Sequence, residues 1–326
     1  MCCKGILTYE KGFIRKKCSN FKKSHLLAEN DVDISLNLYY NNLVNDVILA
    51  ETYDMMDKIS LAGDLGSGKS TVSKILIDRL GATYYSTGSI VRSIAEKRGM
   101  TVTELNVYME THPEIDHEID DGLAALSSRD EFLIIDSRMA WHFTKGTFPI
   151  YLSTDIETSA LRIMNANRRG EHAATLDETI SETRARRESE KKRYMTQYGV
   201  DIKDLSNYSL IVDTTVATPD EVAECIISAF LAWQKDKSYK VAFVSPERLY
   251  YPDEAADEEL ISSLSSMLEE GKPIPEVRIT ERDGEFYLVS GLESALAYTF
   301  TKGSFIPAVL VKDKPEGDFV KMKNSL

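Results

Sequence analysis

The stretch Gly63–Ser70, GDLGSGKS, constrains the fold more than any other part of this chain. It matches the pattern GxxxxGK[ST] and directly follows a short apolar run at Ile59–Ala62. After it, apolar residues recur at helical spacing over Thr71–Leu80, which predicts a helix. A strand, a glycine-rich turn and a helix in this order form a phosphate-binding loop, because the N–H groups of the turn and the helix N-terminus face the phosphates.

Two side chains of this loop have expected roles in phosphoryl transfer. Lys69 is expected to reach the β and γ phosphates of ATP, and the Ser70 hydroxyl is expected to coordinate Mg²⁺. ATP and Mg²⁺ are therefore the predicted cofactors. The predicted ATP-binding residues belong to the loop and to the turn that follows it: Gly63, Gly66, Ser67, Gly68, Lys69, Ser70 and Thr71.

The chain divides into three regions. Residues 1–57 are an N-terminal extension of irregular, polar sequence without recognisable chemistry. Residues 58–234 alternate short apolar runs with amphipathic stretches, which predicts an α/β fold with a parallel sheet and helices on both faces. Residues 241–326 are predicted to form a small α+β domain, with a hairpin turn at 282–284. The predicted strands of this last domain are 241–244, 276–280, 286–290 and 308–311.

A second strand, turn and helix follow the phosphate-binding loop. Its turn, Ser86-Thr87-Gly88, begins a helix in which Arg92 lies one turn further on. Ligands of α/β folds bind where the parallel strands end, so these groups are expected at that edge of the sheet. The planar fork of an arginine suits a phosphate. The pattern therefore predicts a site for the acceptor of the phosphoryl group.

Composition limits the partners and the compartment. The net charge of −13 would repel a phosphate backbone, so nucleic acid is not an expected partner. The basic segment 1–23 is interpreted as a solvated tail, and a contact arm for an anionic partner is the alternative. No apolar run approaches the roughly 20 residues that span a bilayer, and the first residues lack the pattern of a secretory signal. We expect a cytoplasmic protein without a membrane partner.

Several short motifs follow in a specific order. They are STGSIVR at 86–92, THPEID at 111–116, a strand ending in DSR at 136–138, RRESEKKRY at 186–194 and YGVDIKDLS at 198–206. In this order the chain resembles the archaeal-type cytidylate kinases of the nucleoside monophosphate kinase family, over roughly residues 58–232. The resemblance implies transfer of the γ-phosphoryl group of ATP to CMP or dCMP.

The resemblance also implies roles for individual residues. Asp136 would hold the hydration shell of Mg²⁺. The family typically has Glu-Gly-Arg where this chain has Asp136-Ser137-Arg138, and a serine side chain at that point would narrow the acceptor pocket. The identity of the acceptor base therefore stays open. The implied acceptor-binding residues are Ser86, Thr87, Gly88, Arg92 and Arg138.

The segment 165–198 is expected to form a helical lid rich in arginine. Guanidinium groups that close over the transferred phosphoryl group stabilise its charge and exclude water. Glutamates alternate with these arginines, so a solvated helix face with ion pairs one turn apart is the other interpretation. Arg187 and Arg193 match the family motif, and together with Lys69 they are the predicted catalytic residues.

Residues 241–326 resemble the ParB/sulfiredoxin-like domains in the order of their elements. Proteins of that superfamily bind a phosphate or a nucleotide with a basic residue shortly after a glycine. Here Gly291 is followed by Leu292 and Glu293, and a carboxylate at a helix N-terminus would repel a phosphate. We therefore expect a degenerate domain that serves regulation or assembly, through a protein partner or self-association.

Two other functions stay open at the level of sequence. A kinase of the same fold could act on another nucleotide or on a small metabolite. A nucleotide-binding regulatory protein could carry the same loop without turnover. The chain has no guanine-selecting NKxD motif, which argues against a GTPase.

Overall fold

The computed structural model describes residues 57–165, 175–301, 304–313 and 317–322. The predicted N-terminal extension, except for its last residue, and the lid arginines at 168 and 169 lie outside these ranges. The strands of the described part are β1 (Lys58–Gly63), β2 (Thr83–Ser86), β3 (Leu133–Asp136), β4 (Thr147–Ser153), β5 (Leu210–Asp213), β6 (Val241–Val244), β7 (Leu249–Pro252), β8 (Arg278–Arg282), β9 (Glu285–Ser290), β10 (Ile306–Leu310) and β11 (Phe319–Lys321).

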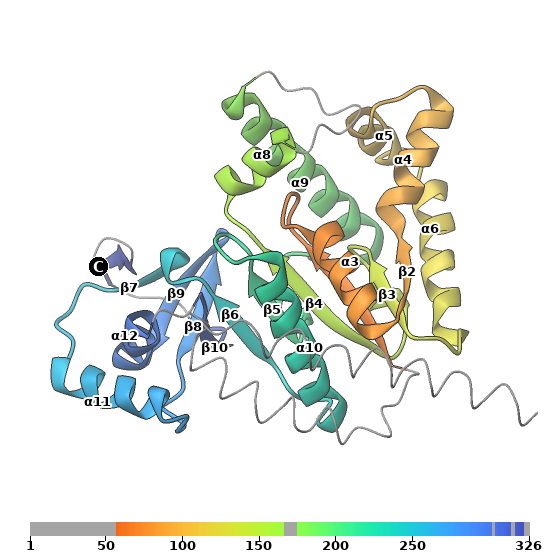
Figure 1. Ribbon diagram of the computed structural model, residues 1–326. Helices are drawn as coiled ribbons and strands as arrows, with labels where there is room; N and C mark the ends of the chain where they lie inside the picture. The colour runs from red at the N-terminus through yellow and green to blue at the C-terminus, as the bar shows by residue number, and fades with distance from the viewer. Residues whose placement is uncertain (1–56, 166–174, 302–303, 314–316, 323–326) are drawn as a thin grey trace, which may run out of the picture.

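Helices surround these strands, as Figure 1 shows. No helix in the described ranges is both long and apolar enough to cross a membrane. The helices are α3 (Lys69–Leu80), α4 (Thr87–Arg98), α5 (Val102–Met109), α6 (Glu114–Ala125), α7 (Ala140–Phe143), α8 (Ile156–Asn165), α9 (Leu176–Tyr198), α10 (Pro219–Lys235), α11 (Glu258–Glu269) and α12 (Leu292–Phe300).

The described strands form one eleven-stranded sheet in the order β11-β7-β9-β8-β10-β6-β5-β4-β1-β3-β2. From β5 to β2 every neighbouring pair is parallel. All six residues of β1, at the centre of this parallel part, are buried. A strand that is covered on both faces has no solvent side, which is why the run Ile59–Ala62 lacks charged residues. The predicted α/β fold with a parallel sheet is confirmed.

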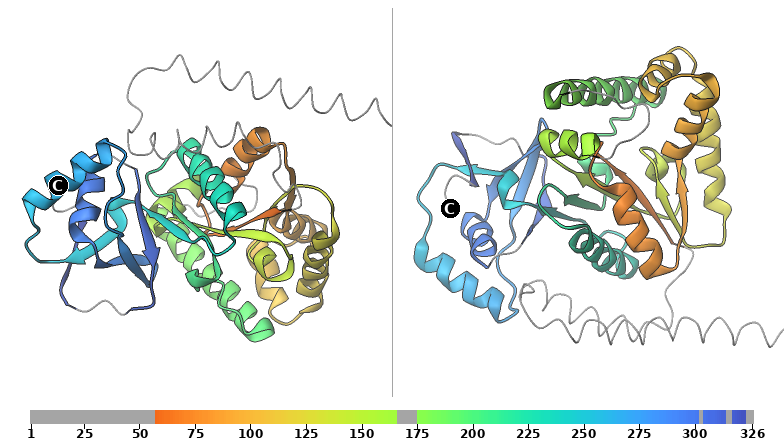
Figure 2. Two further views of the ribbon diagram at one scale, coloured as in Figure 1. Left: turned by 90° about the horizontal axis from the view of Figure 1, so that it is seen from below. Right: turned by 45° about the horizontal axis from the view of Figure 1, so that its top comes forward.

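Helices lie on both faces of the parallel part and leave the carboxyl ends of its strands at one edge. α3 and α10 lie side by side on one face, joined by ion pairs from Arg79 to Asp220 and Glu224 (Figures 1 and 2). α8 and α9 lie above the edge where the phosphate-binding loop emerges, and α4, α5 and α6 flank β2 (Figure 1). The fold thus surrounds that edge with helices contributed by distant parts of the sequence.

Local sequence signals set several helix ends. Three helices begin with a capping box, in which a threonine and a glutamate three residues later bond to each other's backbone N–H groups. Three helices end at a glycine in the left-handed conformation. The capping pairs are Thr101 with Glu104, Thr175 with Glu178 and Thr218 with Glu221, and the glycines are Gly81, Gly99 and Gly199.

The sheet continues without interruption into the C-terminal part. β6 pairs in parallel with β5 and antiparallel with β10, so backbone hydrogen bonds cross the predicted boundary at 234–240. The predicted hairpin is present, with β8 and β9 antiparallel and a turn at Asp283-Gly284. The strand predicted at 276–280 lies two residues later, and β7 and β11 were not expected. The division into separate domains stays a prediction.

Phe148 of β4 lies at the centre of the packing between the sheet and α10. Its side chain is 0% exposed, and its ring centroid lies 5.8 Å from that of Phe230 and 5.3 Å from that of Trp233.

Phe148→Ala is expected to lower the free energy of unfolding by about 3–5 kcal/mol, because the lost ring leaves a cavity. Urea denaturation measures the change. The matched control Phe300→Ala removes a ring that is 57% exposed and should change stability by less than about 1 kcal/mol. Similar losses in both variants would contradict this placement of the core.

Candidate active site

The phosphate-binding loop connects β1 to α3 and packs tightly against its neighbours. A Cβ atom on Gly63 would lie 2.3 Å from the carbonyl oxygen of Leu152, and one on Gly66 would lie 2.6 Å from that of Ser159. Gly63, Gly66 and Gly68 have φ values of +141°, +73° and +83°, a region that favours glycine. Close approach and backbone conformation therefore both require glycine in this loop.

Lys69 begins α3, and its ammonium group turns back over the loop. Its Nζ donates to the carbonyl oxygens of Gly63 at 3.0 Å and Asp64 at 2.7 Å, and to Oγ of Ser67 at 3.3 Å. Burial, together with the nearby guanidinium group of Arg138, lowers the pKa of Lys69 to about 7. A bound phosphate would favour the protonated ammonium, because an adjacent anion raises the pKa of a lysine.

The predicted Mg²⁺ ligands lie at the same edge of the sheet. Ser70 and Thr71 are exposed in the first turn of α3. Asp136 ends β3 and pairs in register with Leu61, two residues before the loop. The hydroxyl of Tyr84 donates to the Asp136 carboxylate at 2.9 Å. A serine hydroxyl and a carboxylate are the hard oxygen ligands that a hydrated Mg²⁺ accepts, so both residues fit the ion.

The predicted acceptor-binding residues gather at the start of α4. Ser86 caps this helix, and Thr87 Oγ1 donates to the carbonyl oxygen of Asp136 at 3.4 Å. A Cβ atom on Gly88 would lie 3.5 Å from Nη1 of Arg92. Arg92 is exposed and makes no ion pair with any carboxylate in the described part of the chain. Its charge is therefore available to an anion.

Arg138 joins the end of β3 to the long helix α9. Its Nε lies 2.9 Å from Oε2 of Glu190, whose Oε1 lies 3.2 Å from Nε of Arg186. Burial opposes both charges, but the two guanidinium groups hold the pKa of Glu190 well below its usual range, and Glu190 raises the pKa of Arg138. Ser137 is buried, and its Oγ accepts the N–H of Met139 at 3.2 Å, so this hydroxyl stabilises the turn after β3.

A buried carboxylate lies within the loop itself. Asp64 is 5% exposed, and it accepts the hydroxyl of Tyr151 at 2.9 Å and the N–H of Thr154 at 3.1 Å. Lys203 Nζ pairs with Asp64 Oδ1, and Arg187 Nη2 lies 3.6 Å from the same oxygen. Burial raises the pKa of Asp64, but Lys203 and Arg187 outweigh burial and hold the pKa well below its usual range.

These charged groups line a small, partly open pocket beside the loop. Three of its lining side chains are cations and two are carboxylates, so the lining carries an excess of positive charge. A lining with this balance of charge favours an anion over a cation. The charged lining residues are Asp64, Arg138, Arg187, Glu190 and Lys203.

Comparison with known proteins supports a kinase. Residues 63–197 match the family described as an AAA domain. The cytidylate kinase of Thermoplasma volcanium is 36% identical over 175 residues, which cover 52% of this chain and 90% of that protein. The cytidylate kinase of Sulfurisphaera tokodaii is 35% identical over 182 residues, which cover 55% and 98%. The chain belongs to the family of these P-loop kinases.

About half of this P-loop kinase is also similar, in sequence or in structure, to proteins that are not named cytidylate kinase. The S-adenosylmethionine-dependent nucleotide dehydratase of Lacinutrix mariniflava is 36% identical over 177 residues, and the chain spans only 36% of that relative. A shikimate kinase from Acinetobacter baumannii is similar in structure, with a TM-score of 0.38 and 18% identity over 55% of this chain and 95% of that one. These matches leave the resemblance of residues 241–326 to ParB/sulfiredoxin-like domains as a prediction.

The structure places the two arginines predicted to be catalytic, Arg187 and Arg193, in different surroundings. Arg187 lies beside the phosphate-binding loop with Lys69, whereas Arg193 lies among residues of α5 and α6. Arg193 is 6% exposed, its Nε lies 3.1 Å from Asp116 Oδ2, and its Nη1 donates to Asn106 Oδ1 at 3.2 Å. These contacts join α9 to the acceptor side of the fold, and the catalytic role of Arg193 stays a prediction.

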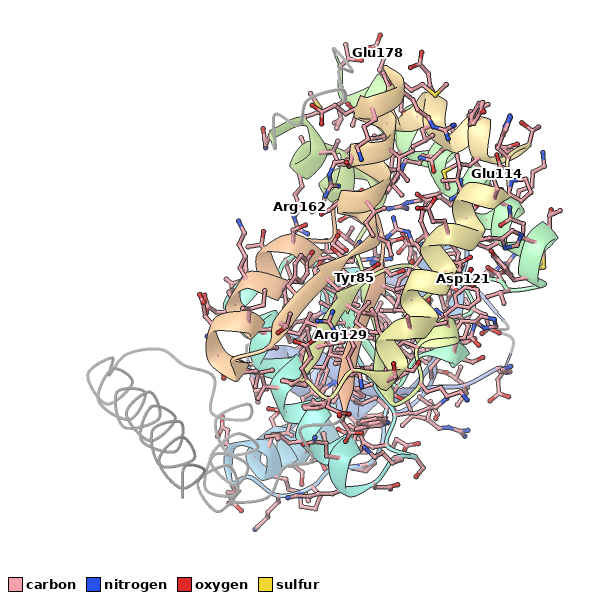
Figure 3. All side chains as sticks on the ribbon, turned by 90° about the vertical axis from the view of Figure 1, so that its right-hand side faces the viewer. Tyr85, Glu114, Asp121, Arg129, Arg162 and Glu178 are labelled. Carbon is pink, nitrogen blue, oxygen red and sulfur yellow. The ribbon has the colours of Figure 1, made fainter. Side chains whose placement is uncertain are left out.

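The acidic helix α6 is only partly solvated. Glu114 and Asp121 are exposed on its outer side (Figure 3). Asp116 and Asp120 are buried, and Tyr198 donates to Asp120, whose pKa burial raises to about 6. These two carboxylates therefore belong to the interior of the fold, although the helix that carries them is acidic. In the described ranges, no three or more His, Cys, Asp or Glu side chains are grouped so that they could hold a metal ion.

Sequence reasoning missed Asp64 and Lys203. An aspartate inside a loop that binds phosphates is itself a signal, because its charge would repel the ligand unless a cation neutralised it. The partner was not identifiable, since Lys203 lies 139 residues further along the chain.

Asp64→Asn tests this charge cluster, because it removes the carboxylate that Lys203 and Arg187 share. The pKa of Asp64 is lower in the folded than in the unfolded state. Its stabilising effect is therefore fully present above about pH 4 and is lost as the pH falls below that value. We expect the free energy of unfolding of the variant to be about 3 kcal/mol lower than that of wild type near pH 7.

Denaturant titrations at a series of pH values measure both effects, with the exposed Asp78→Asn on α3 as the control. A deficit that stays constant down to pH 3 would show that the charge of Asp64 does not cause it.

Proposed function

We propose that this P-loop kinase transfers the γ-phosphoryl group of ATP to a nucleoside monophosphate, with CMP or dCMP as the acceptor. The observation that carries the proposal is the position of two anion-binding groups at one edge of the sheet. Asp136 pairs in register with both Leu61 and Ser86, so the ATP loop and the acceptor residues follow β1 and β2, the strands on either side of β3. The names of the two archaeal relatives support the choice of acceptor.

The residues suit this chemistry because phosphoryl transfer depends on positioning and charge stabilisation more than on a strong general base. The loop and Lys69 would hold the triphosphate. Arg92 and Arg138 would hold the acceptor phosphate and orient its attacking oxygen. Arg187, already beside the loop, would face the negative charge on the transferred group.

Two features would support these residues during transfer. The helix α9 would exclude water above the site. Mg²⁺, held through Ser70 and Asp136, would neutralise charge on the β and γ phosphates.

The decisive measurement is ADP release in a coupled assay across a panel of nucleoside monophosphates. We expect release that depends on CMP or dCMP, and a loss of at least about a hundredfold with Lys69→Ala, because the loop loses its charge on the β and γ phosphates. Lys74→Ala, exposed on the same helix, is the matched control and should retain full activity.

Each alternative has its own outcome in this assay. Turnover of UMP, AMP or a small metabolite without turnover of CMP would move the acceptor to that compound. ATP binding without turnover of any acceptor would favour a nucleotide-binding regulatory protein.

Arg92→Ala separates the two ligand sites. Arg92 lies in the acceptor group and has no contact with the ATP loop among the described hydrogen bonds. We expect the KM for the acceptor to rise by roughly tenfold or more, because a charged hydrogen bond to phosphate is lost. The Kd for ATP should change by less than about twofold. Arg98→Ala, at the other end of α4, serves as the control. A larger loss of ATP affinity than of acceptor affinity would contradict the assignment of Arg92.

A further inference from the structure

One arginine of the C-terminal part is buried against the kinase part. Arg248 ends the 3₁₀ helix η3 (Pro246–Arg248) and is 3% exposed. Its Nη1 donates to Ser153 Oγ at 2.9 Å and lies 3.2 Å from Asp213 Oδ1. Burial opposes its charge, but Asp213 and Glu285 outweigh burial and raise the pKa of Arg248. Arg248 is therefore a cation enclosed by protein.

Arg248 bridges the ends of two strands beside the phosphate-binding loop. Ser153 is the last residue of β4 and Asp213 the last residue of β5, and the two are paired in register. The C-terminal hairpin holds the arginine from the other side. Its Nη2 donates to the carbonyl oxygen of Gly284, and its guanidinium carbon lies 5.2 Å from the ring centroid of Phe286.

Hydrogen bonds lead from these strand ends directly to the loop. Thr214, the residue after Asp213, donates its hydroxyl to the carbonyl oxygen of Ser67 at 3.1 Å. The N–H of Asp64 donates to the carbonyl oxygen of Leu152, next to Ser153, at 2.9 Å. The two strands that Arg248 bridges thus fix both the beginning and the middle of the loop.

A side chain of α8 makes a second connection in the same place. Arg162, labelled in Figure 3, donates to the carbonyl oxygen of Thr214 at 2.6 Å and to that of Gly66 at 3.4 Å. A shift at the end of β5 would therefore reach the loop by two routes. Both routes end on backbone atoms of the loop, whose placement decides how well it binds phosphates.

We propose that Arg248 is a positioning residue for the phosphate-binding loop, so that the C-terminal part completes the ATP site. It acts through Ser153 and Asp213 and touches no ligand itself. The inference rests on the proposed function only for its ligand, ATP, and it does not depend on the identity of the acceptor. Regulation or assembly by this part of the chain stays a separate prediction.

The test uses the full chain with Arg248→Met and with the double variant Arg248→Met/Asp213→Asn, which also removes the buried charge of Asp213 and leaves only the partly exposed Glu285 without its cation. The Kd for ATP, measured by calorimetry without acceptor, is expected to rise roughly ten- to a hundredfold, because small displacements of a binding loop are costly. The KM for the acceptor should stay within about twofold of wild type. Arg278→Met, which removes an exposed arginine of β8, is the matched control.

Hydrogen exchange separates positioning from a general loss of stability. Peptides covering 63–70 should exchange faster in the variants, whereas those covering β2 and β3 should not change. Arg248→Lys keeps the charge but cannot contact Ser153 and Asp213 with a planar guanidinium group, so its Kd for ATP should be intermediate. If the methionine variants do not fold, the Kd of Arg248→Lys tests the inference.

Folded variants with wild-type ATP affinity and unchanged exchange at 63–70 would overturn the inference. That outcome is distinct from failure of the proposed function, which would appear as ATP binding by wild type without turnover of any nucleotide acceptor.

Discussion

The buried carboxylate of Asp64 is the constraint on which the arrangement around the phosphate-binding loop depends. A negative charge in a loop that must hold anions is tolerable only if cations neutralise it. Lys203 and Arg187 supply that neutralisation, and Tyr151 and Thr154 satisfy the remaining hydrogen-bonding capacity of the carboxylate. Because these partners come from β4, α9 and the segment after α9, the charge of one loop residue joins three separate parts of the chain. The same requirement places the guanidinium group of Arg187 beside the phosphate-binding loop.

The helix α9 is attached to the rest of the kinase mainly through polar side chains. Four of its 23 residues are buried, namely Thr179, Thr183, Glu190 and Arg193, and none of them is apolar. Its ion pairs run from Glu190 to Arg138 and from Arg193 to Asp116. Near its C-terminus the partly buried rings of Tyr194 and Tyr198 also pack against an apolar cluster. The part of the helix before Tyr194 can move away from the sheet while exposing little apolar surface, since little hydrophobic free energy opposes that movement. This property suits a lid that must open for ligands and close for transfer. The buried charges at the same time select one closed position, because unpaired charges are costly in the interior.

Local sequence signals predicted the elements, whereas distant pairings escaped them. The loop, the helix α3 and the strands of the parallel sheet were predictable because glycine positions, apolar spacing and buried runs are local features. Lys203 and Arg248 were not, because nothing in the residues next to either one identifies the carboxylate that it meets in the folded chain. Their partners, Asp64 and Asp213, lie 139 and 35 residues away. The short strands β7 and β11 were missed for a similar reason, since their pairing partners make them strands more than their own residues do. The family motif predicted Arg187 and Arg193 as equals, but only the folded chain shows that their surroundings differ.

The pairing of β5 with β6 explains how the C-terminal part bears on the nucleotide site. Without β6, β5 would be an edge strand with unpaired N–H and C=O groups, and its end would carry the residues that hold the loop. Edge strands are the more mobile and vulnerable members of a sheet. β6 pairs with β5 along this edge, and Arg248 forms an ion pair with Asp213, the last residue of β5. The hairpin of β8 and β9 contributes further, because the carbonyl oxygen of Gly284 in its turn accepts a hydrogen bond from Arg248. The C-terminal part is therefore continuous with the sheet that positions the phosphate-binding loop. A displacement of β6 or of Arg248 would be transmitted to the end of β5 and from there to the loop.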